Sequence, residues 1–432
     1  MSSEPPIQFE RDLPHLAIRR RTLPCGLEVV VHEDPSVPQV IVSTWYRVGS
    51  SDERPDRTGF AHLFEHLFKS PPHRLGGHHY EVLRRAGATE ANASTSPDRT
   101  AYHEILPAHQ LALALWIESD RMGYFAPHFD EQRLITQQAV VRAERRQRYE
   151  DVPYGVERFA TAEALYPEGH PLRHLVIGRH ADIAAATVDD VLAFYRTWYV
   201  PANATLVIAG DIPPDADELV DRYFGGFPRS HRPPRAVPPA VRLVPNRQRV
   251  DDRFATLGRV HRAWHAPAAF SDGEAELDVL ASAWCAAGTG ALWRRLVYDA
   301  PLAQRVSAWT ASGRLGGELH VVVDLRTGVD PQAVRAVLDE ECARGIDARA
   351  IRRIVVRREA SIIWALSQLG RRAQYLQRSV LYTNSPDGLA GELSRYRAVT
   401  VETVDAARAR WVDASAMVEI ETTARASAAS GS

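Results

Sequence analysis

Lysine is almost absent from this chain: of its 52 basic residues, all but Lys69 are arginine. We attribute this bias to genomic base composition and not to function. The chain also lacks an excess of charge of either sign, because 54 acidic residues leave a formal net charge of -2. A chain so near neutrality gives no reason to expect binding to nucleic acid or to a membrane surface.

Long apolar runs and cysteines are scarce as well. No run approaches the ~18 apolar residues of a membrane span, and residues 1–21 lack the apolar core of a signal peptide. The three cysteines, Cys25, Cys285 and Cys342, are odd in number and far apart, so they make no disulfide framework. We therefore expect a soluble protein of a reducing, bacterial cytoplasm.

The length of 432 residues and a hydrophobic content of 45% predict two or more domains. An internal repeat defines them: the segment from Thr187 is echoed by the segment from Thr400, and Trp198 corresponds to Trp411. A stretch rich in proline and arginine between the halves predicts an extended linker. We predict an α+β protein with domains at 1–228 and 246–432 and a linker at 229–245. Each domain should be a mostly antiparallel sheet with helices packed on one face.

The most informative motif is His62-Leu63-Phe64-Glu65-His66, an H-x-x-E-H run. Residues four apart lie on one face of a helix, so His62 and His66 can offer two imidazoles to one metal ion. Zn²⁺ suits such ligands, and a water molecule can take its open position. Glu65 is then placed to take a proton from that water. The reversed order of the motif is the inverzincin form of the zinc-protease pattern.

An ordinary helix with two surface histidines is the alternative, because a motif with only three fixed positions also arises by chance. Apolar neighbours such as Phe60, Phe64 and Phe68 favour the metal site, since they predict a largely buried helix. Buried imidazoles and a buried carboxylate need partners, and a shared metal would supply them. Thr58 is the expected N-cap of this helix.

A third protein ligand is required for a zinc site. Residues 130–155 predict one long helix in which apolar residues alternate with charged ones, and Glu144 lies on it. The other interpretation of Glu144 is a solvated carboxylate that pairs with Arg145 or Arg148.

At this point the sequence resembles the pitrilysin/insulinase metallopeptidases, which include the mitochondrial processing peptidases. Their pattern is H-x-x-E-H followed by a glutamate roughly 75–80 residues later on a second helix. The segment "VVRAERRQRYEDVPYG" is similar to that second helix, and the likeness covers the whole first half of the chain. The resemblance implies that His62, His66 and Glu144 hold Zn²⁺ and that Glu65 is the general base.

The resemblance also implies residues around the metal. The strand in "GATEANASTSPDRTAYHEILP" is similar to the family's substrate strand, where the pair Asn92-Ala93 faces the peptide backbone. Gln137 stands two helical turns before Glu144, where many relatives have glutamate, and can face the same site. Glu118 is a candidate carboxylate behind a zinc histidine, with a surface helix position as the alternative.

The second half lacks a metal motif, because the repeat offset places Ala275, Asp278 and Val279 at the motif positions. Related chains carry an Arg-x6-Tyr pair that holds the substrate carbonyl. This chain has Val297 and Gln304 there, so its stabilisation of the oxyanion is expected to be incomplete. The resemblance therefore implies a heterodimer in which a homologous partner supplies the arginine and tyrosine.

We predict a zinc endopeptidase subunit that cleaves unfolded peptides, or a precursor or leader peptide, inside a two-subunit chamber. One rival is a non-catalytic homologue that acts in assembly or peptide binding. Another is a metal- or peptide-binding protein without turnover. A second histidine group, His73, His78 and His79, could suggest another metal site, but its Pro/Gly-rich surroundings favour a solvent-exposed loop.

Overall fold

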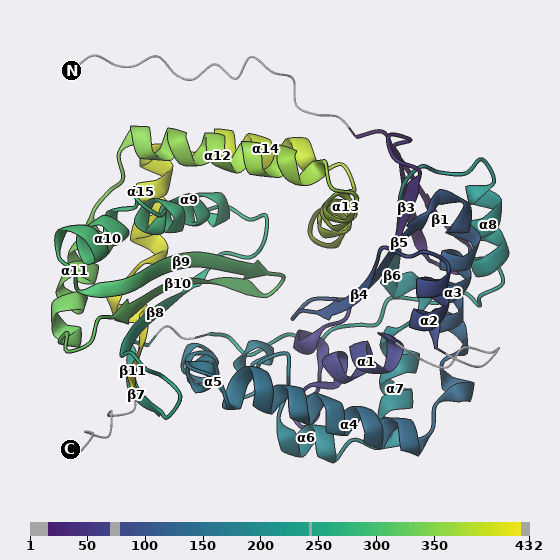
Figure 1. The fold of residues 1–432 in the computed structure, drawn as a ribbon, viewed down its shortest axis with the longest axis horizontal. Helices are drawn as coiled ribbons and strands as arrows, with labels where there is room; N and C mark the ends of the chain where they lie inside the picture. Colours follow the sequence, from purple (N-terminus) through teal and green to yellow (C-terminus); the bar gives the residue numbers. More distant parts are fainter. Residues whose placement is uncertain (1–15, 70–77, 242–243, 425–432) are drawn as a thin grey trace. The chain divides into compact units, whose positions relative to one another are not determined.

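The structure is a computed structural model that describes residues 16–69, 78–241 and 244–424 (Figure 1). The described residues form two compact units. The N-terminal unit contains residues 16–241 and 366–387, and the C-terminal unit contains residues 244–365 and 388–424. Each unit is built around its own sheet. The domain boundaries expected from the sequence, 1–228 and 246–432, stay a prediction.

The described part of the N-terminal unit contains a six-stranded mixed sheet with the order β1-β2-β6-β3-β5-β4. Only β2 and β6 pair in parallel among these strands, and β4 lies at an edge. The strands are β1 (Ile18–Thr22), β2 (Glu28–Glu33), β3 (Gln39–Tyr46), β4 (Glu90–Thr95), β5 (Thr100–Pro107) and β6 (Ala204–Gly210).

Both faces of this sheet are covered, which explains why its central strands are apolar at successive positions. On β6, Leu206 and Ile208 enter the larger core, whereas Val207 and Ala209 face the opposite side. Helix α13 (Leu369–Thr383) packs on that opposite side, although it comes from the second half of the sequence.

Helices of the first half form the layer on the other side of the sheet (Figure 1). They are α1 (Phe60–Lys69), α2 (His79–Arg85), α3 (Leu111–Tyr124), α4 (Glu131–Arg145), α5 (Gly155–Leu165), α6 (His180–Ala184), α7 (Val188–Trp198) and α8 (Ala216–Phe224). Within this layer, α1 and α3 contact the strands of the sheet directly. None of the described helices is long and apolar enough to cross a membrane.

The C-terminal unit repeats this plan with a described five-stranded sheet of order β7-β11-β8-β10-β9. Its strands are β7 (Asn246–Asp252), β8 (Arg259–Ala266), β9 (Ala303–Gly313), β10 (Gly316–Leu325) and β11 (Val418–Ala424). Its helices are α9 (Glu274–Cys285), α10 (Ala291–Trp293), α11 (Pro331–Ala343), α12 (Ala348–Leu366), α14 (Leu389–Arg397) and α15 (Val401–Trp411).

The internal repeat is confirmed in structural terms. Thr187 caps α7 and Thr400 caps α15, each by accepting a hydrogen bond from the backbone N–H three residues later. Both helices end at the repeated tryptophans, and each leads into a strand of its sheet, β6 or β11. The predicted fold class is confirmed, and the structure adds α13 on the second face of the first sheet.

Candidate metal centre

Helix α1 carries the H-x-x-E-H motif, and a buried carboxylate holds its first turn. Glu53 accepts hydrogen bonds from the backbone N–H groups of Gly59 at 2.8 Å and Ala61 at 2.7 Å. His174 Nε2 lies 3.0 Å from the same carboxylate. Because the first N–H groups of a helix have no partners within the helix, an anion here stabilises the start of α1. Burial nevertheless raises the pKa of Glu53, whereas the hydrogen bonds from these three partners lower it and favour the ionised carboxylate.

The prediction that Thr58 caps α1 was wrong. Thr58 Oγ1 donates instead to Asp182 and accepts a hydrogen bond from the N–H of Arg179. Gly59 precedes the helix with φ +88°, against Gly178 with φ +70°. A Cβ on Gly178 would lie 2.4 Å from the Gly59 Cα atom, so the two backbones approach as closely as they do only because both are glycine.

The motif side chains lie at the inner surface of α1. His62 and Glu65 are buried, and His66 is partly buried. The apolar residues of the helix fill the core on the other side, which confirms the expectation of a largely buried helix. Packing thus fixes the orientation of the helix and with it the direction of both imidazoles.

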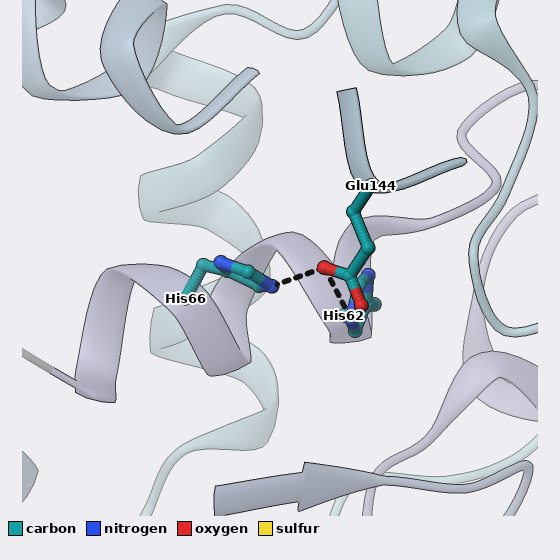
Figure 2. A group of neighbouring side chains, drawn as sticks. All are labelled: His62, His66 and Glu144. Carbon is teal, nitrogen blue, oxygen red and sulfur yellow. Dashed lines mark ion pairs between the residues drawn. The ribbon is translucent and has the colours of Figure 1, made fainter. Parts of the chain in front are cut away.

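Glu144 comes from the second helix, α4, and meets both histidines (Figure 2). Its Oε2 atom lies 3.1 Å from His66 Nε2 and 3.8 Å from His62 Nε2. One potential ligand atom from each of the three residues lies within 4.8 Å of the others, and no other such group occurs in the described residues. The structure therefore brings together the three residues that the sequence singled out as metal ligands.

Arg148 holds the other oxygen of Glu144. Its Nη1 atom lies 2.8 Å from Glu144 Oε1, so the carboxylate also has the arginine partner of the alternative interpretation. Arg145 turns away and pairs with Glu150 at 2.8 Å. The prediction of one long helix needs correction here: α4 ends at Arg145, and a π-helical turn, Arg146–Glu150, follows. Such wide turns recur at functional sites.

The chemistry of this donor set fits a zinc ion. Burial, followed by the charges of His66 and Arg148, lowers the pKa of His62 to about 3. The imidazole is therefore neutral at physiological pH, which is the form that binds metal. Two imidazoles and one carboxylate, with a fourth position left for water, are the ligands of many catalytic zinc sites.

Thr95 is a residue that the sequence gave no reason to select. Its Oγ1 atom donates to Glu65 Oε2 at 2.7 Å, from the last position of the edge strand β4. The contact joins residues 30 positions apart, and only the folded sheet brings them together. No local sequence signal could have identified it.

The two residues proposed to face a substrate backbone lie on β4. Asn92 is exposed, Ala93 is buried, and they pair with His103 and Tyr102 of β5. No strand of the described sheet lies beyond β4. Main-chain groups at such an edge remain available for another strand.

Gln137 and Glu118 have different surroundings. Gln137 and His66 line the same cavity of about 250 Å³, together with aromatic residues of the segment between α3 and α4. Glu118 is fully buried, where it pairs with Arg121 and contacts Glu104. No described residue accepts a hydrogen bond from the buried Nδ1 atom of His62. A supporting role of Glu118 behind a zinc histidine stays a prediction without a contact in its favour.

The second histidine group does not form an exposed loop as a whole. His79 is completely buried in α2, with Nε2 3.2 Å from Asp120, so the expectation was wrong for this residue. His78 lines the cavity beside His66. His73 lies outside the described residues.

In the C-terminal unit, the positions that correspond to the motif lie on α9. Ala275 and Val279 are buried there, and Asp278 accepts a hydrogen bond from Tyr396 at 2.8 Å. Val297 packs against the second core, and Gln304 is exposed on β9. Neither residue offers the strong donor that a carbonyl-holding pair requires.

This two-domain fold, with an inverted zinc-protease motif in its first unit, defines the class of protein. The family model of the insulinases (peptidase family M16) matches residues 28–170, and that of the peptidase M16 inactive domain matches residues 185–355. The chain belongs to this family, the pitrilysin/insulinase metallopeptidases.

Curated relatives include zinc protease PqqE of Helicobacter pylori, 29% identical over 57% of this chain and 54% of the relative. The uncharacterized zinc protease YmxG of Bacillus subtilis is 28% identical over 49% and 50%, respectively. The chain thus spans about half the length of these relatives. The crystal structure of a protease from H. pylori has the same fold, with a TM-score of 0.87 at 22% identity, and the match covers 95% of this chain and 100% of that one.

Proposed function

We propose that this chain is the catalytic subunit of a zinc-dependent endopeptidase. The observation that carries the proposal is the convergence of His62, His66 and Glu144, with Glu65 on the same helix turn. Membership of a family whose relatives are named zinc proteases supports it.

The roles of the residues follow from their surroundings. His62, His66 and Glu144 would hold Zn²⁺, which when bound activates a water molecule and polarises the substrate carbonyl. Glu65 removes a proton from the attacking water and returns it to the leaving amine. Thr95 holds one oxygen of Glu65 by its hydrogen bond, which leaves the other oxygen for the proton transfer.

The edge of β4 is the proposed binding site for the substrate backbone. A peptide that adds as a strand beside Asn92 and Ala93 gains main-chain hydrogen bonds, which demand little of its sequence. Only an extended segment can pair in this way. The substrates we propose are therefore unfolded peptides, or the precursor or leader segment of one, in a cytoplasmic setting.

We further propose that the active form is a heterodimer that encloses a chamber. Val297 and Gln304 leave this chain without the groups that would hold the carbonyl oxygen. A homologous subunit with an Arg-x6-Tyr pair would supply them.

The rival function is a non-catalytic subunit for assembly or peptide binding. The match of residues 185–355 to an inactive-domain model begins after the candidate metal centre, whose last residue is Glu144. A subunit without turnover needs no pair of imidazoles facing a carboxylate, and no base held by a hydroxyl. The site therefore favours catalysis.

The experiment compares wild type with Glu65→Gln for zinc content and for cleavage of a quenched peptide, each with the homologous partner present. The amide keeps the shape of Glu65 and leaves the three metal-binding side chains intact. We expect full zinc and a loss of roughly 10²–10⁴-fold in rate. A Glu65→Gln protein that cleaves at the wild-type rate would refute this residue as the base, and a zinc-loaded wild type without cleavage would refute the endopeptidase.

A further inference from the structure

Two side-chain bridges join the motif helix α1 to the edge strand β4. In the first, Thr95 Oγ1 donates to Glu65 Oε2 at 2.7 Å. In the second, Lys69 Nζ donates to Asn92 Oδ1 at 3.2 Å. Glu65 and Lys69 are four residues apart, so one turn of the helix provides both contacts. The bridges lie at the two positions of β4 that flank Ala93 and Ser94.

The composition of the chain makes Lys69 notable. Every other basic residue is arginine, so arginine is the residue that this sequence uses for ordinary surface charge. The one lysine side chain in the sequence lies at the end of the motif helix and contacts the proposed substrate strand. A lysine at this position, in a chain that otherwise uses arginine, indicates that the contact requires lysine specifically.

The contacts of Asn92 fix the orientation of its carboxamide. Oδ1 accepts from Lys69 and also from the backbone N–H of Ala93 at 2.9 Å. Only oxygen can accept from both donors, so the Nδ2 group must point the other way. That group donates to no described residue, and Asn92 is exposed. Two amide donors are thus free at the edge where a peptide would pair.

The same contacts show what must change when a peptide binds. The N–H of Ala93 is held by the side chain of Asn92, and an added strand would need such main-chain donors. If this N–H passes to a peptide carbonyl, Asn92 Oδ1 keeps one partner, the Lys69 ammonium.

We propose that Lys69 and Thr95 are positioning residues that couple the docking of a peptide strand on β4 to the geometry of Glu65. Lys69 retains the carboxamide of Asn92 in its substrate-facing orientation, and Thr95 retains the carboxylate of Glu65. The inference rests on the proposed function and adds to it a physical link between substrate edge and general base.

Arginine cannot replace Lys69 in this role. Its guanidinium is a planar fork that suits two parallel acceptors, whereas Asn92 Oδ1 is a single atom already shared with the N–H of Ala93. The compact ammonium group on a flexible stem can direct one proton at that atom.

The experiment measures peptide affinity, KM and kcat with the partner present, together with zinc content. The variants are Lys69→Met, Lys69→Arg, Thr95→Val and Thr95→Ser. Arg85→Met controls for loss of an exposed cation, since Arg85 pairs with Glu81 and with no other acid among the described residues. Thr89→Val controls for loss of a hydroxyl just before β4, because the Thr89 hydroxyl donates to the Ile105 carbonyl and to no α1 group among the described residues.

We expect Lys69→Met and Lys69→Arg to weaken peptide binding and raise KM by roughly 3- to 10-fold, with kcat unchanged. Thr95→Val should lower kcat by roughly 10-fold at unchanged KM, and Thr95→Ser should restore it. Zinc content should stay at one equivalent in all variants, and both controls should match wild type.

Lys69→Arg with wild-type affinity would overturn the role of Lys69, and Thr95→Val with wild-type kcat would overturn that of Thr95. If the control variants changed affinity or kcat as much as the Lys69 and Thr95 variants do, all the effects would reflect a general loss of stability. That result would refute the proposal. A zinc-loaded wild type that binds peptide without cleaving it would refute the proposed endopeptidase and the role of Thr95. Weakened peptide binding by Lys69→Met would then still support the role of Lys69, because affinity is measured without turnover.

Discussion

Three glutamates around α1 have the same side chain and different surroundings. Glu53 is completely buried at the start of the helix, where two backbone N–H groups and His174 surround it. Glu65 receives a single hydroxyl, and Glu144 lies between two imidazoles and Arg148. The first environment suits a structural anion, the second a base with a free oxygen, and the third a metal ligand.

At this scale we predict that Glu144→Ala loses zinc, whereas Gln137→Ala retains it. Two imidazoles without the carboxylate should release the ion readily to a chelator. Gln137 only lines the cavity beside His66, so its removal should reduce activity modestly. Metal analysis after dialysis against a chelator checks both variants. A full equivalent of zinc in Glu144→Ala would defeat the assignment of that ligand.

The sequence predicted which residues form the candidate site, but not which residues hold them in position. His62, Glu65 and His66 lie within one helical turn, where spacing alone places them on neighbouring faces. Thr95 and Glu53 could not be predicted, because their contacts depend on how a strand and a loop pack against α1. Thr58 seemed a good cap because threonine often is one, yet Asp182 takes its hydroxyl.

At the scale of elements, the start of α1 depends on Glu53. We predict that Glu53→Ala lowers the free energy of unfolding by about 1–3 kcal/mol, because it leaves two helix N–H groups and His174 without their acceptor. Denaturant unfolding of the zinc-free chain measures this change. Glu81→Ala, on the exposed side of α2, serves as the control and should stay within about 0.5 kcal/mol of wild type.

Helix α13 should be sensitive to acid. Hydrogen bonds from Arg372 and Ser36 lower the pKa of Asp34 to about 2, so the folded form holds the ionised carboxylate more strongly than the unfolded chain does. The stabilisation is present above pH ~4 and is lost as the pH falls toward 2. We expect the melting temperature of wild type to fall more steeply between pH 4 and 2 than that of Asp34→Asn. Parallel curves for the two proteins would show that this pair does not anchor the helix.

The elements themselves followed from the sequence to different degrees. The helix that begins after Thr187 and its counterpart after Thr400 could be predicted, because their caps and their apolar periodicity are local features of the sequence. The end of α4 at Arg145 and the π turn after it, where Arg145 pairs with Glu150, are not revealed by periodicity. The place of α13 depends on a sheet some 160 residues earlier in the chain.

For the whole molecule, we predict that the purified chain alone is nearly inactive. It combines three proposed metal ligands with Val297 and Gln304, and a homodimer would lack the carbonyl-holding pair on both sides. Loss of one such donor costs about 10²–10³-fold in comparable sites. Addition of a homologous chain with Arg-x6-Tyr should restore cleavage, and mutation of that arginine should remove it. Turnover of about 1–10 s⁻¹ by the lone chain would exclude the heterodimer.

The position of α13 also bears on how the protein is made. Synthesis of strand β6 is complete at Gly210, but the helix that covers its second face is complete only at Thr383, about 170 residues later. At ordinary rates of synthesis that delay is roughly 10–35 s. During this interval the newly made sheet has an apolar face that α13 does not yet cover. The nascent chain should therefore be a client for chaperones, and a gene cut at the linker should yield an aggregating product rather than a working half.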